Sequence, residues 1–240
     1  RFRPHHPTAS PAAATSPAAT SARTRFGIWK ATVNALIFPA APNAYAATIS
    51  RTCPSTRESA VAAPNTALDR ASRLDFDEIE LAVRAFARLG VSKLRLTGGE
   101  PLLRKNLPEL VARLAAVPGI TDLALTTNGS LLAGQARALR QAGLARLTVS
   151  LDALDPTLFK ALSGGRGNVA DVLAGIAAAE AAGFASIKIN AVVQRGVNDG
   201  EVLALVQHFR GSGHVLRFIE YMDVGNCNGW QRQRVVSSAE

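Results

Sequence analysis

The sequence is poor in the residues that build metal sites, disulfide frameworks and membrane spans. Its 240 residues include two cysteines, four histidines and one methionine, and aromatic residues make up 5%. Cys53 and Cys227 are too few and too far apart for a disulfide framework or a self-contained zinc site. No apolar run approaches the roughly 20 residues that a membrane-spanning helix needs. We therefore expect a soluble, cytoplasmic protein from a reducing compartment.

Acidic residues are almost missing from the first part of the chain. None precedes Glu58, and residues 1–74 hold nine Lys/Arg against two Asp/Glu, a charge of +7. Residues 75–240 hold eighteen against sixteen, a charge of +2, so the fold itself offers little reason to expect nucleic acid as a partner. We expect residues 1–73, rich in Ala, Pro, Ser and Thr, to be a disordered or frame-shifted segment without stable structure. An organellar transit peptide is the alternative for this Arg-bearing, Ser-rich segment.

From Leu74 onward the pattern becomes that of an α/β protein. Asp75 and Glu78 form a capping signature for a first helix, which Gly90 ends. Apolar strand-like runs then alternate with helix-like stretches in units of roughly thirty residues, which favours parallel strands and right-handed crossovers. We expect a partial (β/α) barrel over residues 74–240. The expected strands are Lys93–Thr97, Asp122–Thr127, Arg146–Leu151, Ser186–Val193 and Val215–Met222, and the expected helices lie near 106–117, 131–142, 168–182 and 199–211.

Polar residues gather where the expected strands end. In a barrel of this kind the chemistry sits at the carboxyl ends of the strands. Groups that follow five successive strands would therefore converge on one mouth and form an active site there. These ends read Thr97–Glu100, Thr126–Gly129, Ser150–Asp152, Lys188–Asn190 and Glu220–Asp223.

The corner after the first of these strands has the most specific local pattern. Gly98 and Gly99 let the backbone approach a ligand closely, and Glu100 can accept hydrogen bonds from a ligand ammonium group. Pro101 sets the direction of the chain toward the next helix. An amino acid or its derivative would suit this corner. An ordinary tight turn with a solvated Glu100 explains the same residues.

Two basic residues interrupt apolar strands. Arg95 lies between two leucines and Lys188 between two isoleucines, so each points into the barrel interior if its neighbours pack outward. Two inward cations indicate an anionic ligand such as a phosphate.

Other polar residues have structural explanations. Helix capping would account for the residues that follow two of the strands, and two histidines show no ligand spacing. The Gly-rich loop at 164–167 lacks the lysine of a P-loop and is expected to be only a loop. The capping candidates are Thr126, Thr127, Asn128, Ser150 and Asp152, and the histidines expected to be structural are His208 and His214.

Five segments between Leu74 and Glu240 occur in a specific order. They are LRLTGGEPLLRKNLPELVARLAAVPGI, LALTTNGSLL, AGLARLTVSLDALDP, KINAVVQRGVND and LRFIEYMDVGNCNGW. Together they resemble the GTP 3′,8-cyclase family of molybdenum cofactor biosynthesis, which are radical S-adenosylmethionine (SAM) enzymes. The resemblance implies a partial barrel in which SAM is cleaved to a 5′-deoxyadenosyl radical. That radical would abstract hydrogen from the ribose of GTP and start cyclisation to a pterin precursor.

The resemblance also implies roles for individual residues and partners. It makes Gly99, Ser150 and Met222 contacts of SAM, with Gly98 and Glu100 completing the turn that holds its methionine end. It makes Arg95, Thr126 and Lys188 contacts of GTP. A downstream pterin-forming enzyme is implied as a partner, and we expect a homodimer, with neither nucleic acid nor a membrane as partner.

The residues that bind the family's [4Fe-4S] cluster are missing from their expected place. The family has a CxxxCxxC stretch before the first helix, whereas this chain has only Cys53 there, and Cys227 matches no ligand position. We therefore expect no metal ligands in this chain. The chain stops at Ser237–Glu240, which is a helix-start signature, so we also expect a truncated C-terminus. Two alternatives to a working cyclase follow: an inactive SAM- and GTP-binding remnant, or another radical SAM enzyme such as a peptide-modifying one.

Overall fold

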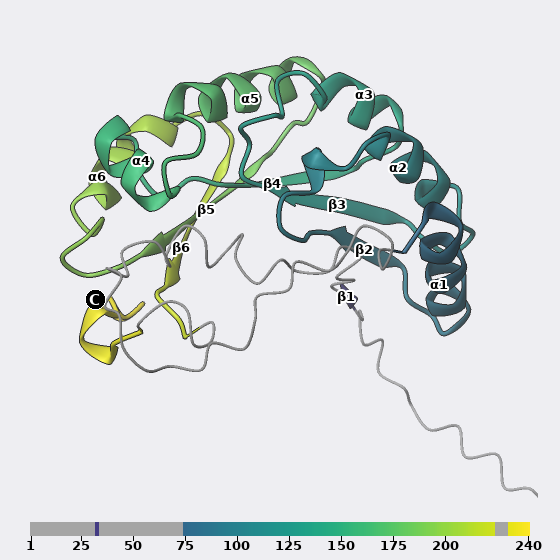
Figure 1. Ribbon diagram of the computed structural model, residues 1–240, viewed down its shortest axis with the longest axis horizontal. Coiled ribbons are helices and arrows are strands. Elements are labelled where there is room, and N and C mark those ends of the chain that lie inside the picture. The colour runs from purple at the N-terminus through teal and green to yellow at the C-terminus, as the bar shows by residue number, and fades with distance from the viewer. Residues whose placement is uncertain (1–31, 34–73, 224–229) are drawn as a thin grey trace, which may run out of the picture.

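The computed structural model describes residues 32–33, 74–223 and 230–240. Within these residues, six strands form one sheet in the order β1-β2-β3-β4-β5-β6, and all five neighbouring pairs are parallel. The sheet curves, as Figure 1 shows, into part of a barrel. Its strands are β1 (Thr32–Val33), β2 (Lys93–Leu96), β3 (Asp122–Thr127), β4 (Arg146–Ser150), β5 (Lys188–Val193) and β6 (Val215–Glu220).

The helices form an arc along the outer side of the sheet (Figure 1). Each crossover between neighbouring strands from β2 to β6 contains at least one helix, as parallel pairing requires. None of the described helices is long and apolar enough to cross a membrane. They are α1 (Phe76–Arg88), α2 (Leu107–Ala115), α3 (Ala136–Gln141), α4 (Pro156–Leu162), α5 (Val169–Ala181) and α6 (Glu201–Phe209), with the short 3-10 helices η3 (Pro101–Leu103) and η4 (Arg232–Arg234).

The hydrophobic core lies between the sheet and these helices. Alternate strand residues such as Leu96, Leu125 and Ile189 are completely buried in it. Helical residues such as Leu110 and Leu139 pack from the other side and are also completely buried. Because successive strand side chains point to opposite faces, the strand residues between those that pack against the helices face the barrel interior. Of the functional candidates, those within the strands lie on that inner face: Arg95, Thr126, Ser150 and Lys188.

The expected α/β partial barrel is confirmed, with small differences at the ends of elements. The capping box of α1 forms as predicted: Glu78 N–H donates to the Asp75 carboxylate, Asp75 N–H donates to the Glu78 carboxylate, and both distances are 2.8 Å. Gly90 follows the helix with a φ of +90°, which favours glycine. Helix α4 was not predicted, although Asp155 caps it by accepting from Leu158 N–H at 2.7 Å.

Strand β1 lies within the N-terminal segment for which we expected no stable structure. It pairs with Lys93 and Leu94 at the edge of β2. Such an edge offers unpaired backbone groups that a neighbouring segment can join whatever its side chains, so composition did not indicate this pairing. The rest of residues 1–73, including Cys53, lies outside the described residues, as does Cys227.

The C-terminal residues 230–240 fold back over the carboxyl ends of β5 and β6. Val235 forms an antiparallel bridge with Gln194, and Glu240 makes an ion pair with Arg195 at 2.6 Å. Trp230 Nε1 donates to the Tyr221 carbonyl at 3.2 Å. These contacts fix one side of the mouth of the partial barrel.

Candidate functional site

Glu100 joins the turn after β2 to the end of β3. One carboxylate oxygen accepts from Leu102 N–H at 3.0 Å and from the Thr127 hydroxyl at 2.7 Å. The other accepts from Asn128 N–H at 2.7 Å. Burial raises the pKa of Glu100, and these three hydrogen bonds oppose that rise. The internal donors give Glu100 a structural role, as the residue that holds the Gly98-Gly99 turn against the next strand.

The residues at the end of β3, Thr126 and Thr127, and Asn128 directly after it do not cap the helix that follows, so this alternative is wrong. Helix α3 begins at Ala136, and no side chain makes a cap hydrogen bond at its start. Thr127 instead accepts from Gly129 N–H, and Asn128 accepts from Ser130 N–H, both at 3.0 Å. These bonds stabilise the turn directly after the strand, so that turn is tied both to itself and to Glu100.

Arg95, Thr126 and Lys188 share the inner face of the sheet. Arg95 Nη1 donates to the hydroxyl of Thr126 at 2.9 Å and to that of Thr148 at 3.1 Å. Thr148 is the register partner of both Thr126 and Lys188, and register partners on parallel strands point to the same face. The structure therefore brings together the three residues that the resemblance assigns to GTP.

The inner face carries more charge than Arg95 and Lys188, the two inward cations predicted from the sequence. Lys93, Arg146 and Arg217 occupy inward positions on β2, β4 and β6, together with Asp122 on β3. The pKa of Lys188 is lowered, first by burial and then by Arg146, Arg217 and Arg95, while Asp122 acts in the opposite direction. Residues two apart on a strand point to the same face, so the sequence could have indicated that Lys93 lies beside Arg95 and that Arg146 lies beside Thr148.

The predicted SAM residue Ser150 lies at the carboxyl end of β4, where its register partner is Asn190 of β5. Two residues later, the Asp152 carboxylate accepts from Val192 N–H at 2.8 Å. Asp155 is the N-cap of α4, so the expectation that Asp152 caps a helix is wrong. Although Asp152 is a half-buried residue, burial of its carboxylate raises its pKa to about 6, and the hydrogen bond from Val192 opposes that rise.

The remaining predicted residues lie at the end of β6, just after it or in loops, outside the group formed by Arg95, Thr126 and Lys188. Met222 follows β6 and is 49% exposed. Glu220 accepts from Ser238 N–H at 2.8 Å, which ties it to the C-terminal segment. His214 lies 3.0 Å from Glu180 with a buried side chain, a structural position. Residues 164–167 form the turn between α4 and α5.

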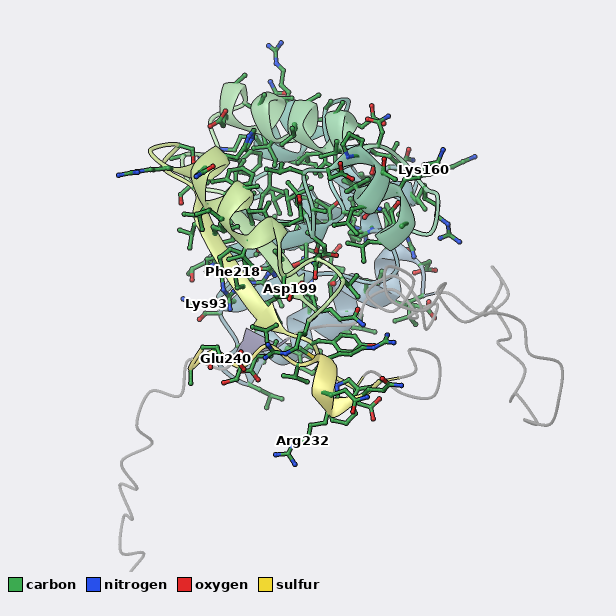
Figure 2. All side chains as sticks on the ribbon, turned by 90° about the vertical axis from the view of Figure 1, so that its left-hand side faces the viewer. Lys93, Lys160, Asp199, Phe218, Arg232 and Glu240 are labelled. Atoms are coloured by element: carbon green, nitrogen blue, oxygen red, sulfur yellow. The ribbon has the colours of Figure 1, made fainter. Side chains whose placement is uncertain are left out.

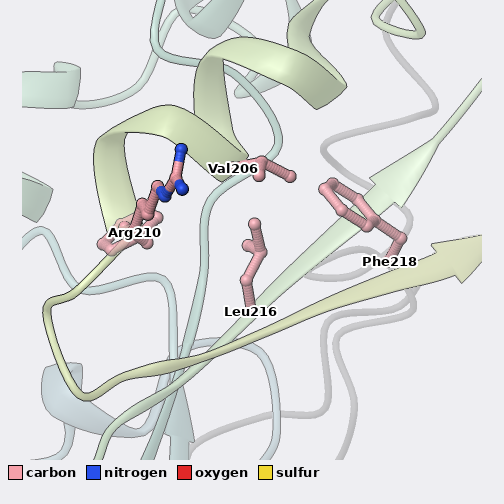
Figure 3. Close-up of a pocket in the computed structure, with 5 residues that line it drawn as sticks. Val206, Arg210, Leu216 and Phe218 are labelled. Carbon is pink, nitrogen blue, oxygen red and sulfur yellow. The ribbon is translucent and has the colours of Figure 1, made fainter.

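A cavity of about 340 Å³ lies on the opposite, outer face of β6 against α6 (Figure 3). Its lining is mostly apolar, and it is remote from the inner-face cations because Leu216 and Phe218 alternate with Arg217 along the strand. It does not belong to the candidate site. The lining residues are Val206, Phe209, Arg210, Leu216 and Phe218.

The chain belongs to the radical SAM superfamily, whose family model matches residues 52–209. Coproporphyrinogen III oxidase from Escherichia coli, a radical SAM enzyme, has a similar fold, with a TM-score of 0.51 and 17% identity. This similarity covers 68% of the chain and 41% of that enzyme.

Proteins related in sequence fall into a narrower group than those that share the fold. The chain is 69% identical over 173 residues to a GTP 3′,8-cyclase of Xanthomonas campestris, which covers 72% of this chain and 51% of that relative. It is 59% identical over 178 residues to a GTP 3′,8-cyclase of Acidothermus cellulolyticus, covering 74% of this chain and 49% of the relative. The chain thus spans about half the length of the relatives that it matches.

Proposed function

We propose that this chain is the substrate-binding barrel of a radical SAM GTP 3′,8-cyclase, which converts GTP to a cyclic pterin precursor in molybdenum cofactor biosynthesis. The observation that carries the proposal is the cluster of Arg95, Thr126 and Lys188 on one face of three strands. The GTP 3′,8-cyclase relatives support the same assignment.

The inner face suits a triphosphate because positive charge dominates it. Arg95 is oriented by the hydroxyls of Thr126 and Thr148, so its position is fixed before a ligand arrives. The pKa of Lys188 is lowered by burial and then by neighbouring cations, and a phosphate bound there would relieve the repulsion between these cations. We infer that Arg95 and Lys188 bind phosphate oxygens and that Thr126 supplies a hydroxyl to the nucleotide. A peptide substrate would give this charge no partner, which argues against a peptide-modifying enzyme.

The residues proposed to bind SAM come from the carboxyl ends of three strands. Gly98 and Gly99 follow β2, Ser150 ends β4, and Met222 follows β6. This arrangement fits SAM, since the turn held by Glu100 offers its backbone to the methionine end. When bound and reductively cleaved, SAM supplies a 5′-deoxyadenosyl radical. The contribution of these residues is to hold SAM at the mouth beside the GTP-binding cations.

The [4Fe-4S] cluster does not fit this chain. A site with three thiolate ligands needs three cysteines, and the 240 residues contain two. We therefore propose that these residues bind SAM and GTP but do not cleave SAM by themselves. An inactive SAM- and GTP-binding remnant is the second candidate function, and the cysteine count is the observation that favours it.

Partners and location follow from the proposed function. The product would pass to a pterin-forming enzyme, and a homodimer is the proposed assembly. Both GTP and this product are compatible with a cytoplasmic location.

The substrate assignment is tested by Lys188→Ala. Loss of one charge-assisted contact with phosphate should weaken GTP binding by about 1.5–3 kcal/mol, measured by isothermal titration calorimetry. Lys160→Ala is the matched control, because Lys160 is exposed on α4 and lies on the other side of the molecule from Lys93 (Figure 2). Equal GTP affinity in the two variants would refute the proposed phosphate site.

The missing cluster is tested by anaerobic reconstitution with iron and sulfide. The 240-residue chain should bind no stoichiometric [4Fe-4S] cluster and should form no 5′-deoxyadenosine from SAM under a strong reductant. A chimera that joins residues 74–240 to the remaining segments of the Xanthomonas campestris relative should do both. Cleavage of SAM by the chain alone would show that the cysteine assignment is wrong.

A further inference from the structure

Asp122 occupies an unusual position among the inner-face cations. It begins β3, and its carboxylate accepts from Arg146 of β4 through Nε at 2.8 Å and Nη2 at 2.5 Å. Lys93 of β2 approaches the same carboxylate at 3.7 Å. The side chain of Asp122 is 16% exposed, so solvent screens these contacts only in part. One carboxylate thus joins cations from both neighbouring strands.

The inner face would otherwise carry positive charge alone. Lys93, Arg95, Arg146, Lys188 and Arg217 occupy inward positions on four strands. The acidic residues in the strands β2 to β6 are Asp122 and Glu220. Glu220 is the register partner of Val193 and therefore points to the outer face, as Val193 does. Asp122 is therefore the acid of the inner face within these strands.

We propose that Asp122 is a positioning residue that sets the charge of the phosphate-binding face. It holds Arg146 and attracts Lys93 toward the amino-terminal end of the strands, so that Arg95 and Lys188 meet the phosphate groups. This inference rests on the proposed function, since it assumes that the face binds an anionic ligand. A bidentate pair fixes the guanidinium plane as well as its charge, which is why Arg146 is held more firmly than Lys93.

The effect on Lys188 follows from the same geometry. Asp122 favours the charged form of Lys188, whereas Arg146, Arg217 and Arg95 disfavour it. Without the carboxylate, Lys188 would be left with Arg146, Arg217 and Arg95, and with no inward acidic residue in the strands β2 to β6. Asp122 thereby favours the charged form of the Lys188 ammonium group while limiting the net positive charge around it.

The first test measures binding of tripolyphosphate by Asp122→Asn in the full 240-residue chain. Asn preserves the size of the side chain and removes one negative charge. Calorimetry should show binding that is tighter by about threefold to tenfold at low salt, with a steeper dependence on NaCl. Asp77→Asn is the matched control, because Asp77 pairs with Arg113 on the helical surface and should leave the affinity unchanged. Unchanged or weaker binding in Asp122→Asn would overturn the inference.

The second test measures the pKa of Lys188 directly and does not require a ligand. The pKa of its ammonium group, followed by NMR of labelled lysine, should fall in Asp122→Asn and stay constant in Asp77→Asn. A purely structural salt bridge would change thermal stability without this shift. If the wild-type chain does not bind tripolyphosphate, the proposed function loses its substrate site, and the Lys188 pKa alone decides the role of Asp122.

A charge-restoring variant covers the case in which Asp122→Asn does not fold. Asp122→Asn combined with Arg146→Gln removes both members of the pair and returns the net charge to its original value. This double variant should bind tripolyphosphate within about threefold of the wild type. Binding weakened more than about tenfold would show that Arg146 itself contacts the anion, which contradicts the inference.

Discussion

The two faces of the sheet are built from the same strands but serve different purposes. On the outer face, Leu125 and Ile189 are completely buried against helices. On the inner face, the neighbouring residues Thr126 and Lys188 belong to the polar, cationic site. Because side chains alternate along a strand, a shift of one residue exchanges a stabilising position for a binding position. The comparison predicts that stability and ligand affinity respond to separate, interleaved sets of substitutions.

The largest expected effect comes from breaking the outer face at Leu125. Leu125→Ala should lower the free energy of unfolding by about 2–5 kcal/mol, because it leaves a cavity in the core. The neighbouring inner-face variant Thr126→Val loses a hydrogen bond with Arg95 and should cost about 0.5–1.5 kcal/mol. Urea denaturation of both proteins measures the difference. Equal losses in the free energy of unfolding would mean that the outer face does not contribute more to stability than the inner face.

A pH-dependent effect is expected at Asp152, on the mouth side of the inner face. Its pKa of about 6 lies above the ordinary 3.8, so the folded state holds the proton more tightly than the unfolded state. Stability from this group is therefore fully present below the ordinary pKa and is lost as the pH rises through 6, by at most about 3 kcal/mol. Relative to wild type, Asp152→Asn should gain stability between pH 4 and pH 7 in denaturation experiments. A constant difference across this range would contradict the raised pKa.

A smaller effect is expected where α5 meets the turn after β3. A Cβ atom on Gly175 would lie 2.6 Å from the Gly129 carbonyl oxygen, so Gly175→Ala must push the helix or the turn. We expect a loss of about 1–3 kcal/mol in the free energy of unfolding, together with weaker GTP binding. Gly200→Ala is the control, because no atom lies within 4 Å of its Cβ position. Tolerance of both substitutions would show that the turn can move without cost.

The outer face and the order of elements could be predicted from the sequence because they depend on local patterns. Asp75 and Glu78 specified the start of α1, and the apolar runs specified five parallel strands. The seven-residue helix α4 was missed because its N-cap Asp155 follows so closely on a strand. The two residues of β1 were missed because pairing at a sheet edge involves the backbone rather than a side-chain pattern.

The inner face could be predicted only in part because its contacts depend on register. Arg95 and Lys188 were identifiable as charges within apolar runs. Their grouping with Arg146 and Asp122 depends on which residues of separate strands lie side by side. The same holds for Asp152, whose hydrogen bond to Val192 spans 40 positions of sequence. The roles assigned to individual residues in SAM and GTP binding stay predictions.

The strand order has a consequence for how the chain folds. Each strand pairs with the one before it in the sequence, and paired residues such as Leu94 and Leu123, or Lys188 and Val215, are only 29 and 27 positions apart. Among the described strands from β2 onward, none therefore depends on a distant part of the chain, and each new strand-helix unit can dock on the sheet already formed. Loop-closure entropy is then lost in several small steps. A chain that leaves the ribosome from its N-terminus can assemble this sheet in the order of its synthesis.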